Sequence, residues 1–118
     1  MSWDVYLKDP VTYETIVFDT PHYMRGGTYQ VGGANEAWLN ITYNYSKHFK
    51  IIDKDRGIHK LQGLSGAESL PLLNKAISVL DDDADPDYWA PTEGNAKRAL
   101  LQLKAMACMR PDGIWEVI

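Results

Sequence analysis

The acidic side chains are the residues of this chain whose spacing most suggests chemistry. Five aspartates lie close together: Asp81, Asp82, Asp83, Asp85 and Asp87. Carboxylates at alternate positions can converge on a calcium ion, which takes several oxygen ligands at about 2.5 Å. A calcium loop has glycine at its sixth position and glutamate at its twelfth, but counting from Asp81 gives Pro86 and Thr92. We therefore predict no metal site and interpret the segment as an exposed acidic loop that can meet a protein partner.

The histidines and the cysteine form no recognisable catalytic or metal-binding set. His22, His48 and His59 lack close metal-ligand spacing, and Cys108 is the only cysteine, so it can form no internal disulfide. We expect Cys108 to be buried in a helix and the protein to reside in a reducing compartment. Acid–base catalysis needs perturbed pKa values, which an exposed acidic loop does not supply. We therefore predict no catalytic residues and no cofactor, and rank an enzyme below a binding protein.

A polar face along segment 37–46 is the first candidate for ligand binding. Apolar and polar residues alternate there, and a strand sends successive side chains to opposite faces. The polar row consists of Trp38, Asn40, Thr42 and Asn44. A flat ring beside a few polar groups is typical of small-ligand sites, and asparagine is unfavourable in strands. The alternative is that this row is simply the solvated side of an antiparallel sheet.

A second set of polar residues completes a site for a small nucleotide-like molecule. Trp38 or Trp89 would stack on such a ligand, while Asn40, Asn44 and Asn95 would make polar contacts. Cations come from the segment 47–60, with Lys47, Lys50, Lys54, Arg56 and Lys60 against Asp53 and Asp55. Such cations can hold phosphate. The alternative for this basic segment is a solvated helix face followed by a turn.

Overall charge and hydropathy exclude some functions. The chain has 118 residues and a net charge of -4, and its excess of acidic over basic residues is located in the segment from Leu61 onward. This negative charge argues against nonspecific nucleic-acid binding. No apolar run reaches the roughly 18 residues of a membrane span, and the N-terminus lacks the pattern of a signal peptide. We expect a soluble, cytoplasmic protein that folds as one domain over residues 1–118.

The first half of the chain has the patterns of strands. Trp3, Val5 and Leu7 alternate with polar residues, and segments 15–18 and 28–31 are rich in β-branched and aromatic residues. With segment 37–46 these predict about four antiparallel strands, joined by turns at the glycine pairs 26–27 and 32–33.

The second half has the patterns of helices. A helical period begins at Tyr45 and should end before Gly57. Ser65 and Glu68 have the spacing of a capping box, but we expect the second helix to begin at 67–69 so that Pro71 falls in its first turn. Thr92 should cap a third helix, and segment 114–117 should dock on the core as an apolar tail. The predicted class is α+β, with an N-terminal antiparallel sheet packed against about three C-terminal helices.

Four segments carry a resemblance that covers most of the chain. They are GGANEAWLNITYNYS at 32–46, GLSGAESLPLL at 63–73, DYWAPTEGNA at 87–96 and RPDGIWE at 110–116. In these segments the chain resembles a group of small uncharacterised proteins encoded by phages, prophages and some bacteria. The resemblance implies a phage accessory protein that binds a host protein, a group that includes inhibitors of host antiviral defence, and it transfers no catalytic residue. Our leading hypothesis is thus a non-enzymatic binder of a host protein; the alternative is a binder of a small nucleotide-like molecule, or an enzyme acting on one.

Overall fold

The computed structural model describes residues 1–19, 28–29 and 35–118 of the chain. Its elements, in chain order, are β1 (Ser2–Lys8), β2 (Thr28–Tyr29), β3 (Trp38–Thr42), the 3₁₀ turn η1 (Tyr43–Tyr45), α1 (Ser46–Phe49), η2 (Gly57–Leu61), α2 (Gly66–Val79), α3 (Glu93–Met109) and β4 (Ile114–Val117). The α+β class is confirmed. Among the described helices, none has the length and apolarity that crossing a membrane requires.

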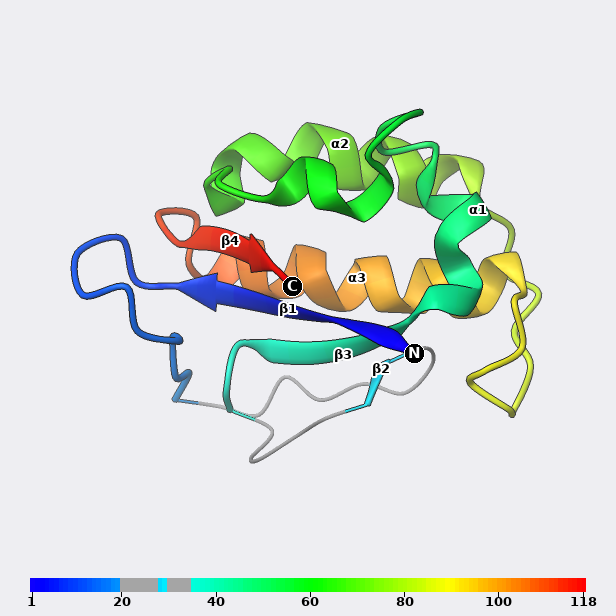
Figure 1. Ribbon diagram of the computed structural model, residues 1–118, viewed down its shortest axis with the longest axis horizontal. Helices are drawn as coiled ribbons and strands as arrows, with labels where there is room; N and C mark the ends of the chain where they lie inside the picture. The colour runs from blue at the N-terminus through cyan, green and yellow to red at the C-terminus, as the bar shows by residue number, and fades with distance from the viewer. Residues whose placement is uncertain (20–27, 30–34) are drawn as a thin grey trace.

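The strands form an antiparallel sheet with the order β2-β3-β1-β4, in which β2 is only two residues long. Val5 of β1 lies opposite Leu39 of β3 on one side and Val117 of β4 on the other. Figure 1 shows α3 running along one face of this sheet, with α2 beside α3 above β4. The odd-numbered residues of β1 therefore face the helices, and the even-numbered residues form the outer face.

The core lies between the sheet and the two long helices. Leu39, Leu100 and Leu103 are fully buried there. Trp115 of β4 is also buried, and its indole Nε1 donates a hydrogen bond of 2.8 Å to Ser69 Oγ on α2. A buried indole N–H needs such a partner, so this bond fixes α2 against the sheet.

Two of the predicted strands differ from the structure. The strand predicted at 37–46 ends at Thr42, whose hydroxyl accepts the Asn44 N–H and turns the chain into η1. Segment 15–18 makes only isolated bridges, from Thr15 to Lys8 and from Val17 to Glu36. The predicted third strand is described only at its first two residues, which form β2. The glycine turns at 26–27 and 32–33 lie outside the described residues.

The C-terminal segment corrects the predicted arrangement, in which every strand came from the first half of the chain. Residues 114–117 are not an irregular tail but strand β4, which pairs with the free edge of β1. Along β4, Trp115 and Val117 are buried whereas Ile114 and Glu116 are partly exposed, the alternation of a strand with one buried face. Pairing satisfies backbone groups that an open edge of β1 would leave unpaired, which is why the segment adopts a strand.

The helix boundaries also differ from prediction. The first predicted helix shrinks to the four residues of α1. Helix α2 begins at Gly66 with a complete Ser65–Glu68 capping box, so the expected start at 67–69 was wrong and Pro71 lies inside the helix. The two capping bonds, of 2.9 and 3.0 Å, satisfy amides at the helix start, which offsets the bond lost at proline. The predicted cap of α3 at Thr92 is confirmed.

Candidate functional site

The acidic loop, defined here as residues 81–91, joins α2 to α3 and folds around one buried side chain. Asn95, on the first turn of α3, has no exposed surface. Its Oδ1 accepts the Asp85 N–H at 3.1 Å, and its Nδ2 donates to the carbonyls of Asp87 at 3.0 Å and Ala90 at 3.1 Å. Asn95 was predicted as a ligand contact, but its amide is fully used in shaping this loop.

The far side of the acidic loop is held by η1 and α1. Asn44 Nδ2 donates to the Trp89 carbonyl at 2.8 Å, and the hydroxyl of Tyr45 donates to the Tyr88 carbonyl. His48 Nε2 lies 2.9 Å from the Pro91 carbonyl. Burial raises the pKa of the Tyr45 phenol, so this hydroxyl keeps its proton and remains a donor. The loop backbone is thus attached to α3 on one side and to η1 and α1 on the other.

The predicted partner-binding aspartates all lie exposed on this loop. Most also hold the loop: Asp83 accepts the Gly94 N–H at 3.2 Å, Asp85 accepts that of Asp87, and Asp87 accepts that of Trp89. Asp82 forms an ion pair of 2.7 Å with Lys97. Across residues 1–19, 28–29 and 35–118, no three His, Cys, Asp or Glu side chains are grouped to hold a metal ion.

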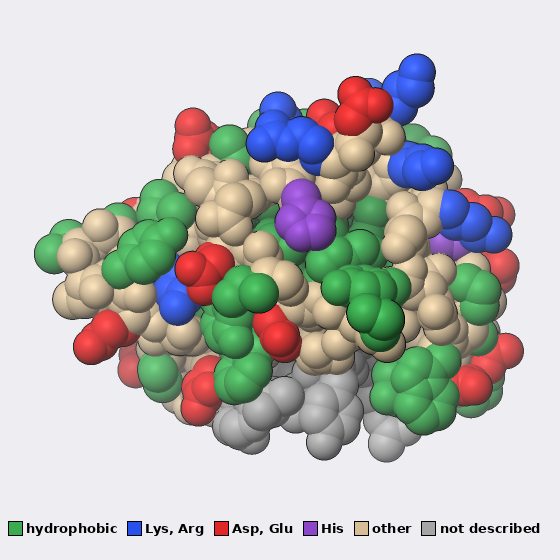
Figure 2. All heavy atoms as spheres, in the orientation of Figure 1, with side chains coloured by type: hydrophobic (Ala, Val, Ile, Leu, Met, Phe, Trp, Pro, Cys, Tyr) green, Lys and Arg blue, Asp and Glu red, His purple; other side chains and the backbone are tan. Residues whose placement is uncertain are grey.

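An aromatic side chain projects from the acidic loop. Trp89 is 56% exposed, and its ring lies against that of Tyr88 with the centroids 4.4 Å apart. Figure 2 shows acidic side chains near the lower right of the molecule, the region of the 81–91 loop in Figure 1. The loop therefore presents an exposed indole among carboxylates on a backbone that is already fixed.

The polar row predicted along β3 is divided in the structure. Trp38 and Asn40 lie on the outer face of the sheet, whereas Thr42 is buried and Asn44 belongs to η1. Trp38 lies about 13 Å along the strand from Thr42. The six predicted ligand contacts therefore fall into two groups: Trp38 and Asn40 on the outer face, and Asn44, Trp89 and Asn95 at the acidic loop, with Thr42 buried between them in the chain.

On the outer face, the polar groups bond to one another. Asp4 Oδ1 accepts the indole N–H of Trp38 and the amide of Asn40, both at 3.1 Å, and Asn40 also donates to Ser2 Oγ at 2.7 Å. Trp38 stacks on Tyr6, with the ring centroids 5.1 Å apart and the planes 22° from parallel. Trp38 and Asn40 therefore have a structural role in β3, because both pair with side chains of the neighbouring strand β1.

The basic segment lies on a different part of the molecule. Figure 2 shows Lys and Arg side chains along the upper right, over α1 and the turn that follows. Lys50, Lys54 and Arg56 border a pocket there, and the aromatic residues that line it are Trp3 and Phe49. Sequence reasoning found the cations but missed this pocket, because Trp3 was assigned only to a strand and lies far from them in the chain.

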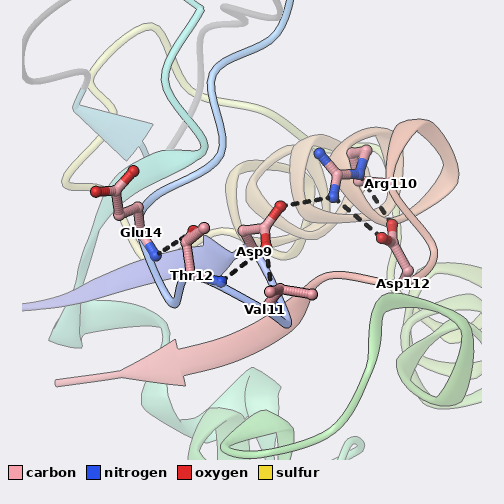
Figure 3. Close-up of polar contacts among 6 residues, drawn as sticks. All are labelled: Asp9, Val11, Thr12, Glu14, Arg110 and Asp112. Carbon is pink, nitrogen blue, oxygen red and sulfur yellow. Dashed lines mark hydrogen bonds and ion pairs between the residues drawn. The ribbon is translucent and has the colours of Figure 1, made fainter.

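A second feature missed in the sequence joins the ends of the fold. Figure 3 shows Arg110, at the end of α3, between Asp9 and Asp112, with Nη2 3.2 Å from Asp9 Oδ2 and Nε 2.9 Å from Asp112 Oδ1. Asp9 also accepts the N–H groups of Val11 and Thr12. The pKa of Asp9 is lowered most by the hydrogen bond from the Thr12 N–H, and further by the Val11 N–H and by Arg110. Arg110 also lowers the pKa of Asp112. These contacts hold the turns after β1 and before β4 together.

The remaining titratable candidates that the structure describes, Cys108, His48 and His59, lie in different places. Cys108 is exposed, so the prediction that it is buried was wrong. His48 contacts the acidic loop and the His59 ring lies 6.3 Å from Trp3, while His22 lies outside the described residues.

Comparison with known proteins adds no relative: no protein-family model, no curated protein and no solved structure matches this chain.

Proposed function

We propose that this protein is a non-enzymatic binding protein whose acidic loop, with its exposed Trp89, docks on a basic surface of a partner protein. The observation that carries the proposal is the exposed Trp89 on a loop fixed by Asn44, Tyr45 and Asn95. The resemblance to phage and prophage proteins supports a host protein as the partner, in the host cytoplasm, with inhibition of antiviral defence as one role of this kind.

Two physical arguments support this surface over others. Binding energy at protein interfaces is concentrated in a few aromatic and arginine residues, and ordering a loop costs affinity when it happens on binding. Here the loop backbone is already held by side chains from α3, η1 and α1. The surrounding carboxylates supply charge complementarity, which speeds association with a basic partner.

The outer face of the sheet supports ligand binding less well. The donors of Trp38 and Asn40 already bond to Asp4 and Ser2, so a ligand would have to replace those bonds. Replacing a satisfied polar contact gives little net affinity. We therefore assign the partner to the acidic loop.

The test is native mass spectrometry of the tagged chain, purified gently from infected or lysogenic cells, with measurement of the retained protein mass. Asp81→Lys and Trp89→Ala are the informative variants. The Asp81 carboxylate has no bonded partner among the described residues, and the Trp89 ring is exposed, so both variants should fold. The retained partner should fall by about tenfold or more in each, and retention should also fall as salt rises.

Matched controls separate this surface from general effects. Glu14→Lys makes the same charge change on an exposed residue elsewhere, and Trp38→Ala removes an indole from the outer face. Both should retain the partner as the unmodified chain does. The proposal would be refuted if Asp81→Lys and Trp89→Ala retained as much partner as the unmodified chain. It would also be refuted if only Trp38→Ala lost the partner.

A further inference from the structure

A pocket of about 170 Å³ opens between α1 and the turn that leads into η2. Its apolar lining comes from three elements: Trp3 of β1, Phe49 of α1 and Ile58 of η2. Phe49 and Ile58 are essentially buried and Trp3 is 8% exposed. The Trp3 and Phe49 rings lie 5.6 Å apart and are tilted by 43°. The apolar wall of the pocket is thus built from the core, with the edge of Trp3 exposed and Phe49 and Ile58 packed behind it.

The rim of the pocket is cationic. Lys50, Lys54 and Arg56 line it and are exposed. Among the described residues, Asp55 is the only acidic one in the lining, which leaves a surplus of two positive charges. None of the three cations forms a salt bridge within the described part of the chain. Asp53, in the same turn, interacts electrostatically with Arg56 but does not line the pocket. A surplus of cations around one concave surface favours an anion, and a doubly charged one most.

The turn that carries two of these cations is fixed without a ligand. Asp53 Oδ2 accepts the N–H of Arg56 at 2.7 Å and that of Asp55 at 3.1 Å, and the Gly57 N–H donates to the Asp53 carbonyl at 2.9 Å. Gly57 has φ of +55°, a conformation that glycine adopts without strain. The backbone positions of Lys54 and Arg56 are therefore set in advance, which lowers the entropy cost of binding.

We propose that this pocket binds a phosphate monoester attached to a ring, as in a mononucleotide. The phosphate lies among Lys50, Lys54 and Arg56, and the ring or sugar lies over the opening towards Trp3 and Phe49. A dianionic phosphate satisfies the cations, and arginine can bind it through two parallel N–H bonds. The volume is below the ~300 Å³ at which pockets for drug-sized molecules begin, so the ligand is small or enters by one end.

This inference does not rest on the proposed function. The pocket involves none of the residues of the acidic loop, and the tryptophan that lines it is Trp3 rather than Trp38 or Trp89. The same phosphate chemistry occurs on free mononucleotides and at the 5′ end of a nucleic acid. The experiment below distinguishes these two sources.

The test is an NMR titration of the full ¹⁵N-labelled chain with AMP, adenosine, inorganic phosphate and an oligonucleotide with or without a 5′-phosphate. AMP should shift the amides of residues 46–58 and the Trp3 indole, with a dissociation constant of about 1 mM or tighter. Adenosine, which lacks the phosphate, should bind at least about tenfold more weakly. If the phosphorylated oligonucleotide binds about tenfold more tightly than AMP, the natural source is a nucleic-acid end; otherwise it is a free nucleotide.

Variants identify the residues responsible. Lys54→Gln with Arg56→Gln should weaken AMP binding about tenfold or more, and both side chains are exposed, so the fold should survive. The control, Lys75→Gln with Lys104→Gln, removes the same charge from α2 and α3 and should leave affinity within about twofold. Three results would each overturn the proposal: adenosine binding as well as AMP, equal loss in both double variants, or no shift at residues 46–58 with any phosphate probe at about 10 mM.

Discussion

Replacing Asn95 with alanine tests whether the acidic loop is built on this one buried amide. The side chain is fully buried and makes hydrogen bonds to Asp85, Asp87 and Ala90. A typical net contribution is about 1 kcal/mol per hydrogen bond, so the three together stabilise the fold by about 3 kcal/mol. Since Asp85 and Asp87, two of the bonded loop residues, are exposed, water can replace part of this hydrogen bonding in the variant. We expect Asn95→Ala to lower the free energy of unfolding by about 2–3 kcal/mol.

Urea unfolding followed by circular dichroism measures that loss, and hydrogen exchange shows where it acts. The amides of residues 81–91 should exchange faster in Asn95→Ala, whereas the β1 and β3 amides should change only as far as global stability falls. Asn74→Ala is the matched control, because Asn74 is exposed on α2 and should cost less than about 0.5 kcal/mol.

Asn95→Asp sharpens the same test. An ionised carboxylate would face the Asp87 and Ala90 carbonyls, which the Asn95 amide now approaches as a donor. Burial and these carbonyls should raise the folded-state pKa of the new carboxyl. The variant should therefore be closest to the original stability at acid pH and should lose stability as pH rises through the raised pKa. A loss below about 0.5 kcal/mol in Asn95→Ala, or unchanged exchange at residues 81–91, would refute the assignment of Asn95 as the main support of the acidic loop.

Three further substitutions test the supports of the fold. Tyr45→Phe leaves the Tyr88 carbonyl without its donor, so we expect a loss of about 1–2 kcal/mol in urea unfolding. Hydrogen exchange in the acidic loop should speed up by more than this global loss explains, and exchange in β1 and β3 only by that loss. Gly94→Ala would place a methyl group 2.6 Å from the backbone of Asp83 and Ala84, which cannot move aside as a side chain can; a loss of about 1–3 kcal/mol is expected, and an unchanged urea midpoint would show that the loop does not pack there. Arg110→Gln removes the cation that lowers the pKa of Asp112 below the ordinary 3.8. The same cation, together with backbone N–H groups, lowers the pKa of Asp9. Because depressed carboxyl pKa values stabilise the fold above the unfolded-state pKa, the variant should be less stable at about pH 7 and should approach the unmodified chain as pH falls below about 4; a difference independent of pH would contradict this pairing.

Local patterns were enough to predict several elements of this protein. The alternation of Trp3, Val5 and Leu7 matches the buried face of β1, and the threonine before α3 caps it as its position predicts. The Ser65–Glu68 pair also had the right spacing, and only the proline that follows led to the wrong helix start. Such signals are readable because capping and pleating involve residues within a few positions of one another.

Contacts between distant parts of the chain decided the rest. The pairing of β4 with β1, the Arg110–Asp9 ion pair across 101 positions and the Asn44 bond to Trp89 across 45 have no local signature. These contacts turned Asn44 and Asn95 from apparent ligand residues into supports of the acidic loop, and placed Trp3 beside the basic segment. An asparagine has the same donors and acceptors whether it binds a ligand or a backbone carbonyl, so its residue type predicts polar contact but only the folded chain decides with what.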